Sequence, residues 1–279
     1  MATWHIEGPE RLALEGQVTQ LDMWLARGRL RVVGTDGPAR VEVRRVGRKG
    51  LTVTYEDGHL SIRHHTRPRW PWMGPVWWFS VGRSNFFADV TVAVPPAVAA
   101  SLTLVAGDVL ATGLRQGATV DVTSGHITLM GLDGAIRAKT VSGSIEALGL
   151  AGDVRLQTVS GEIILADSSA DRLLARTISG AVTCDLDNPY AREVRLDTTS
   201  GAITVRVPED ADLEVNLSAT SGRVTSAFPQ VRATGSAGMR SARGRIGSGK
   251  GVLNAYAVSG SVSLLARPIE DFSPDGDRS

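Results

Sequence analysis

The sequence is poor in the residues that build several common kinds of protein. Its 279 residues include one cysteine, Cys184, which excludes an internal disulfide framework and a multi-cysteine metal site. Aromatic residues make up only 5%, and no uninterrupted apolar run reaches the length of a membrane-spanning helix. The 30 basic and 29 acidic residues leave a net charge of +1, which argues against a nucleic-acid partner. Because residues 1–5 lack a basic or apolar export region, we expect a cytoplasmic protein.

Glycine, by contrast, is abundant, and it recurs with a fixed partner. Seven of the Ser-Gly pairs follow a repeat, with spacings of 18, 18, 19, 21, 21 and 38 residues, and their serines are Ser124, Ser142, Ser160, Ser179, Ser200, Ser221 and Ser259. Apolar residues flank each glycine at alternate positions; around Gly161 they are Val154, Leu156, Ile163 and Leu165. Alternation on both sides of a glycine predicts two half-buried strands joined by a tight turn.

A unit of about 18 residues cannot bury its own apolar face, whereas stacked copies bury a continuous core. The sequence therefore predicts an all-β fold, a single-stranded β-solenoid (β-helix) with about 18–21 residues per rung. Residues 1–100 are expected to form an irregular N-terminal β region continuous with the solenoid, including a hairpin turned by Asp57-Gly58. Residues 101–267 are expected to form regular rungs with a flexible insertion at 228–251, and 268–279 a polar tail.

The run AKTVSGSIEALGLAGDVRLQTVSGEIILADSS at residues 138–169 repeats a strand, Thr-x-Ser-Gly and a second strand. It resembles the bacterial β-strand-repeat family of candidate adhesins, also called toast-rack domains. Residues 21–37 and 244–264 are similar to the same family, so the resemblance covers most of the chain. It implies a β-helix without established catalytic residues, of unknown function, often associated with membrane-stress and cell-envelope responses of the phage-shock type.

Several residue groups are candidates for catalytic, cofactor or metal sites. The repeated serines lack an accompanying base and acid, so we expect their hydroxyls to cap turns. Residues 244–250 match a phosphate-binding loop, but Gly251 stands where a magnesium-binding Ser or Thr belongs and a strand follows. His59, His64 and His65 are expected to lie on a solvated hairpin. The sequence therefore predicts no enzyme, no cofactor, no metal site and no small-molecule substrate.

The first feature that favours an interaction is an aromatic and basic segment at residues 63–83. Its candidate membrane or partner contacts are Trp70, Trp72, Trp77, Trp78, Phe79, Arg67 and Arg69. Tryptophan beside arginine suits a lipid headgroup region, because both side chains combine an apolar body with a polar tip. The alternative is that these tryptophans cap the open end of the solenoid.

The second feature is a basic stripe on outward-facing strand positions. It comprises Arg137, Lys139, Arg155, Arg176 and Arg195, stacked on successive rungs. Like charges at rung spacing repel one another, so the stripe could hold acidic lipid headgroups, an acidic protein face, or neighbours such as Asp197. Solvated surface is the alternative.

Together these features predict a non-enzymatic scaffold or interaction module in envelope or membrane-stress sensing. We expect it to bind a protein partner or to dock at the inner face of the membrane. One alternative is a self-assembling protein whose terminal rungs stack into filaments. Another is a protein that binds or cleaves polysaccharide.

Overall fold

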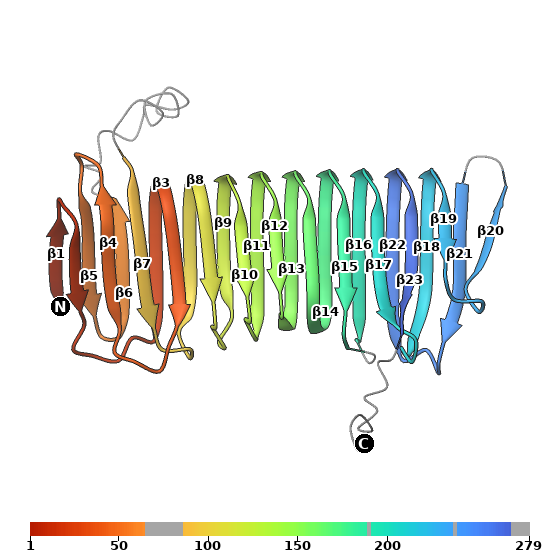
Figure 1. Ribbon diagram of the computed structural model, residues 1–279, viewed down its shortest axis with the longest axis horizontal. Helices are drawn as coiled ribbons and strands as arrows, with labels where there is room; N and C mark the ends of the chain where they lie inside the picture. The colour runs from red at the N-terminus through yellow and green to blue at the C-terminus, as the bar shows by residue number, and fades with distance from the viewer. Residues whose placement is uncertain (65–85, 189–190, 237–238, 269–279) are drawn as a thin grey trace, which may run out of the picture.

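The computed structural model describes residues 1–64, 86–188, 191–236 and 239–268. Within these residues the chain is all-β, with strands and turns and no helix. The strands wind along one long axis as a solenoid-like coil (Figure 1). The expected all-β class is confirmed.

Each turn of the coil contributes one strand to a long face and one to a short face. The long face contains β9 (Ala118–Ser124), β11 (Ala135–Ser142), β13 (Ala151–Ser160), the second half of β14 (Ile163–Ser179) and β16 (Glu193–Ser200). The short face contains β10 (Ile127–Met130), β12 (Ile145–Leu148), the first half of β14, β15 (Val182–Leu186) and β17 (Ile203–Pro208). Neighbouring strands run parallel on both faces. Two long strands, β3 (Gln20–Gly34) and β8 (Ala99–Thr112), contribute to both faces and pair with each other.

The repeated glycines lie directly above one another at the corner between the two faces. Gly143 has φ of 144°, and a Cβ built there would lie 1.9 Å from the carbonyl oxygen of Gly125 on the preceding turn. Only glycine permits this approach, because any side chain would force the two turns apart. The spacing of the glycines therefore sets the register, in which Thr140 lies opposite Thr158.

Antiparallel strands close the N-terminal end of both faces. Beyond β3 the long face continues with β6 (His59–His64), β5 (Leu51–Glu56) and β1 (Ala2–Ile6). The short face continues with β7 (Ala88–Val94), β4 (Arg40–Val46) and β2 (Glu10–Ala13). The hairpin turned by Asp57-Gly58 is present as β5–β6. Because Gly28 pairs with Gly107, the regular winding already includes β3, far before residue 101 where the sequence placed its start.

The C-terminal end departs from sequence order. β22 (Gly251–Ser259) pairs with β16 on one side and with β18 (Leu213–Ser221) on the other, so the last turn is inserted between two earlier turns. β23 (Val262–Arg267) lies likewise between β17 and β19 (Val224–Ser226).

The sequence predicts a flexible insertion between rungs at residues 228–251, but the described part of this segment forms two paired strands. It contains β21 (Met239–Ile246), which pairs antiparallel with β18, and β20 (Arg232–Ser236), which pairs with β21. The physical reason is burial: Val231, Ala242 and Ile246 are at most 5% exposed and extend the core beyond the last parallel turn. This segment therefore caps the end of the coil instead of separating two rungs.

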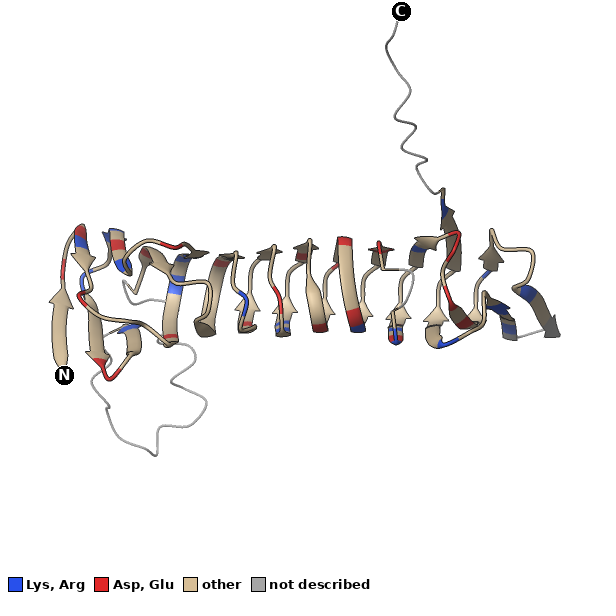
Figure 2. Cartoon of the chain, turned by 90° about the horizontal axis from the view of Figure 1, so that it is seen from below, with Lys and Arg blue, Asp and Glu red and all other residues tan. Residues whose placement is uncertain are grey.

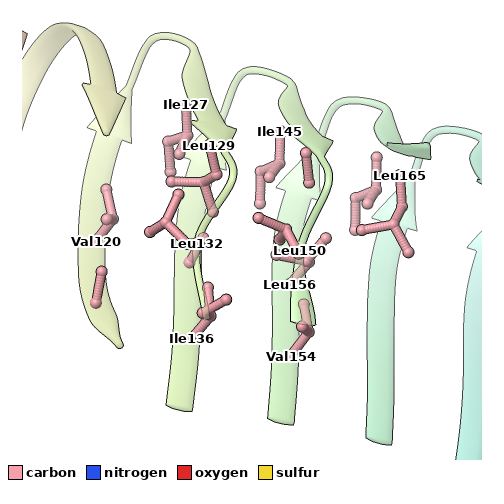
Figure 3. Packing of buried hydrophobic residues seen from close by; sticks show 14 of the residues in the cluster. Val120, Ile127, Leu129, Leu132, Ile136, Ile145, Leu150, Val154, Leu156 and Leu165 are labelled. Carbon is pink, nitrogen blue, oxygen red and sulfur yellow. The ribbon is translucent and has the colours of Figure 1, made fainter. Parts of the chain in front are cut away.

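One apolar core fills the coil, with Ile127, Ile145 and their equivalents stacked from turn to turn (Figure 3). A ladder of threonines, the first residues of successive Thr-x-Ser-Gly motifs, points into it: Thr140, Thr158, Thr177 and Thr198 are buried. The hydroxyl of Thr158 donates a hydrogen bond of 3.1 Å to the carbonyl oxygen of Gly143 on the preceding turn. Thr177 and Thr198 make the equivalent bonds, also at 3.1 Å. These hydrogen bonds connect the inward side chains of the long face to the glycine corner of the preceding turn.

Candidate interaction face

The five basic residues of the expected stripe lie exposed on the outer side of the long face, in two columns: Arg137, Arg155 and Arg195 in one, Lys139 and Arg176 in the other. Figure 2 shows how basic and acidic residues are distributed along the whole coil. Arg137 lies directly opposite Arg155. Leu174 separates Arg155 from Arg195. In the second column Gln157 lies between the two cations. The stripe is therefore interrupted in both columns.

One acid pairs with both cations in the C-terminal part of these columns and offsets part of their charge. Asp197 Oδ2 accepts a hydrogen bond of 3.0 Å from Arg176 Nη2 and another of 3.0 Å from Arg195 Nε. The Asp197 side chain is 16% exposed, whereas both arginine side chains are about half exposed. Charge-assisted bonds of this kind hold the two guanidinium groups against the sheet.

The N-terminal part of the columns has no such compensation. Arg137, Lys139 and Arg155 are exposed and form no ion pair with any residue that the structure describes. Asp121 lies opposite Lys139 on the neighbouring strand but does not reach it. Strands about 4.8 Å apart bring Arg137 and Arg155 close enough to repel, so an anion placed between them is favourable. We call these three residues the basic patch.

An apolar column runs beside the basic patch on the same outer side. Val141, Val159 and Ile178 are 52%, 43% and 51% exposed and occupy equivalent positions on successive turns. We call these three residues the apolar strip. Single exposed valines are ordinary, but adjacent copies form a continuous apolar surface. This strip was not predicted from the sequence, although the sequence carries its signal: a β-branched residue stands at the outward x position of Thr-x-Ser-Gly.

The repeated serines form an exposed column, with Ser142 opposite Ser160, but they do not act as expected. Their hydroxyls make no hydrogen bond to the described residues, and backbone groups carry the turn instead, as in the bond from Gly143 N–H to the Ser160 carbonyl. The predicted capping by hydroxyls is therefore wrong, because the parallel ladder already satisfies these turns.

A different serine contacts a histidine. Ser144 Oγ lies 2.7 Å from His126 Nδ1, while Asp108 Oδ1 accepts a hydrogen bond from the backbone N–H of His126 and not from its ring. The ring-to-acid contact of a Ser–His–Asp triad is therefore not made by these three residues. Among the described residues, no group of three or more His, Cys, Asp or Glu is placed to hold a metal ion.

The segment that resembles a phosphate-binding loop already encloses an anion of the chain itself. The Asp212 carboxylate accepts hydrogen bonds from Ser248 Oγ at 2.8 Å and from the backbone N–H groups of Gly249 and Lys250. The hydrogen bond from Ser248, followed by those from the two backbone amides, lowers the pKa of Asp212. The loop is thus a turn closed by an internal carboxylate, in agreement with the absence of a following helix.

The tryptophan-rich segment cannot be placed on this surface. Trp70, Trp72, Trp77, Trp78, Phe79, Arg67 and Arg69 lie outside the described residues. So does His65, whereas His59 Nε2 lies 3.1 Å from Asp22 Oδ2.

His64, at the end of β6, is buried and not solvated as the sequence suggested. Its Nδ1 accepts a hydrogen bond of 3.1 Å from the Ala26 amide, and its ring packs edge-on against Phe86. The expectation fails because His64 falls on the inward parity of β6. Desolvation lowers the pKa of His64 to about 4.

No described helix could cross a bilayer. The sequence matches no curated protein. Three solved structures are similar. They are a proposed cell adhesion protein from Clostridium sporogenes (10% identity, 93% of this chain and 99% of that chain, TM-score 0.26), a proposed adhesin from Bacteroides fragilis (11%, 95% and 96%, 0.47) and a proposed adhesin from Parabacteroides distasonis (8%, 92% and 96%, 0.29). At these TM-scores the assignment rests on the family match, which covers residues 34–265. The chain belongs to the Toastrack DUF4097 family.

Proposed function

We propose that this protein is a non-enzymatic scaffold that docks on an anionic membrane surface through the basic patch and the apolar strip. One observation carries the proposal: three exposed cations without an acidic partner lie beside three exposed β-branched side chains on one sheet face. A site at the inner face of a bacterial membrane, in a response to envelope stress, belongs to the same proposal and draws its support from the family resemblance.

The two parts of the surface would contribute different energies. Each Lys or Arg near an anionic leaflet contributes about 1 kcal/mol, so the basic patch supplies about 3 kcal/mol that salt weakens. Val141, Val159 and Ile178 would each bury their exposed half in the headgroup boundary, adding up to about 1 kcal/mol per side chain. Neither part alone gives stable attachment, whereas the two together give reversible docking.

The tryptophan-rich segment at residues 63–83 is a second proposed membrane contact. Its support is its composition, since four tryptophans and several arginines stand there without an acid. It is tested separately from the basic patch, by a variant that changes Trp70, Trp72, Trp77 and Trp78 to serine. If that variant stays folded and leaves the vesicles, the segment is an anchor; if it unfolds, the tryptophans cap the core.

The test of the docking face is co-sedimentation with vesicles of phosphatidylcholine, with and without phosphatidylglycerol. The double variant Arg137→Glu/Arg155→Glu changes the patch, and Arg48→Glu/Arg115→Glu, at exposed positions elsewhere, makes the same change in net charge. The wild type and the control should sediment with anionic vesicles only. The patch variant should bind at least about 30-fold more weakly, because two cations contribute about 2 kcal/mol and their reversal adds repulsion.

Equal loss of binding in both variants would show that net charge, and not this face, governs attachment. A wild type that ignores anionic vesicles would remove the membrane as partner; pull-down with an acidic protein face would then be the next experiment. End-to-end self-assembly has less support, since short antiparallel strands, β1, β2 and β20, stand at the ends of the described coil.

A further inference from the structure

A hollow of about 620 Å³ lies at the N-terminal end of the glycine corner, away from the basic patch. Gly28 and Gly107 form part of its lining, and Phe86 and Phe87 line it where β7 begins. The glycines contribute only backbone atoms to this lining. The same corner further along the coil lacks this aromatic wall, since Phe86 and Phe87 precede β7 alone.

Three guanidinium groups border the hollow, and none is fully engaged. Arg29 Nε lies 3.9 Å from Asp108 Oδ2, and Arg45 Nε lies 3.9 Å from Asp89 Oδ2. These distances are too long for hydrogen bonds, so the N–H donors of both arginines remain available. Arg27 forms no ion pair with a residue that the structure describes. Guanidinium donors match carboxylate and phosphate oxygens, which can accept two bonds from one arginine.

The Asp89 carboxylate also lines the hollow and can accept a hydrogen bond. Asp89 Oδ1 is shielded from solvent and has no hydrogen-bond partner among the described residues. A ligand in the hollow cannot reach this enclosed oxygen. The Asp89 side chain is 17% exposed, however, and its other oxygen, Oδ2, lies 3.9 Å from Arg45 Nε and makes no hydrogen bond to the described residues, so Oδ2 can accept one from a ligand hydroxyl. Phe87, 40% exposed, offers an apolar ring beside these polar groups.

From these contacts we infer that the hollow is a binding site for a hydroxylated anion, of the class of sugar acids and sugar phosphates. The anionic group lies between Arg27, Arg29 and Arg45, and a ring hydroxyl donates to Asp89. The carbon face of the sugar packs on Phe87. A simple inorganic anion would pair with the arginines but would leave Asp89 without a hydrogen bond from a sugar hydroxyl. A neutral sugar would donate a hydrogen bond to Asp89 but would leave the arginines without an anion.

Isothermal titration calorimetry with four probes tests this inference: D-glucuronate, glucose 6-phosphate, D-glucose and inorganic phosphate. Both sugar anions should bind at least about tenfold more tightly than glucose and inorganic phosphate. The tighter of the two identifies whether the site takes a carboxylate or a phosphate. The variant Arg27→Ala/Arg45→Ala should weaken both sugar anions at least about tenfold, whereas Arg115→Ala, at an exposed position outside the hollow, should change nothing.

The variant Asp89→Ala separates recognition of the hydroxyl from recognition of the charge. It should bind inorganic phosphate more tightly than the wild type does, and should lose the preference for sugar anions. If Asp89→Ala fails to fold, the four probes and the arginine variant still decide. The inference is overturned if neither sugar anion binds at millimolar concentration, if inorganic phosphate binds as tightly as they do, or if the arginine variant binds them unchanged.

Discussion

Replacing one glycine of the corner tests the stacking that holds the coil together. In Gly143→Ala the new Cβ would lie 1.9 Å from the Gly125 carbonyl oxygen, whereas real contacts stay above about 3.0 Å. The two turns must therefore separate locally by about 1 Å, which weakens the backbone bonds between them, from Gly125 N–H to the Ser142 carbonyl (2.9 Å) and from Ile127 N–H to the Ser144 carbonyl (3.0 Å). With about 1 kcal/mol per bond and 1–3 kcal/mol for the backbone angle, the free energy of unfolding should fall by about 3–5 kcal/mol.

The matched control is Gly131→Ala, directly after the end of β10, between Gly125 and Gly143 in the sequence. Gly131 also has positive φ, 59°, but a Cβ there meets nothing within 4 Å. This variant should lose only about 1 kcal/mol, the cost of the backbone angle alone. Urea unfolding followed by circular dichroism measures both. Equal losses in the two variants, or a Gly143→Ala protein as stable as the wild type, would refute the stacking argument.

Three further predictions concern buried polar side chains. Thr158→Val should lower the free energy of unfolding, measured by urea unfolding, by about 1 kcal/mol, because the Thr158 hydroxyl donates a hydrogen bond to the preceding turn. Thr140→Val should be neutral or stabilising, since the Thr140 hydroxyl has no partner within the described chain. The folded-state pKa of His64, about 4, lies below its unfolded value, so stability should fall by up to about 3 kcal/mol as pH drops from about 6.5 to 4. The urea midpoint of the wild type should therefore fall as the pH drops across this range. This dependence on pH should be weaker in His64→Gln and unchanged in His126→Gln. Burial raises the pKa of the Cys184 thiol, so it should react with a thiol reagent only after unfolding, and rapid reaction in the native protein would contradict its place in the core.

The repeating part of the fold could be predicted because its determinants are local. The glycine spacing fixes where each turn of the coil begins, and the alternation around it fixes which side chains enter the core. Thr158 and Cys184 therefore point inward as their parity indicates.

The order of turns at the C-terminus could not be predicted, because it depends on pairing between distant strands. Leu253 and Ala255 have the same apolar pattern as Val194 and Leu196, so the pattern fits either neighbour of β16. In the structure β18 pairs with β21 on its other side, a long-range contact that no local signal encodes.

Only part of the candidate face could be predicted from the sequence. Outward parity identified the cations, but Asp197 binds Arg176 across a turn of 21 residues, a pairing that needs the three-dimensional register. The apolar strip could have been predicted as well, since Val141 and Val159 stand at the same outward position of the repeat.

The most direct test of the docking proposal asks which face meets the membrane. A cysteine introduced as Val159→Cys on the long face, or as Thr204→Cys on the short face, can carry an environment-sensitive fluorophore, because the native Cys184 is buried. With phosphatidylglycerol-containing vesicles, the account predicts a blue shift for the label at 159 and an unchanged spectrum for the label at 204. Equal shifts at both positions, or a shift at 204 alone, would contradict it.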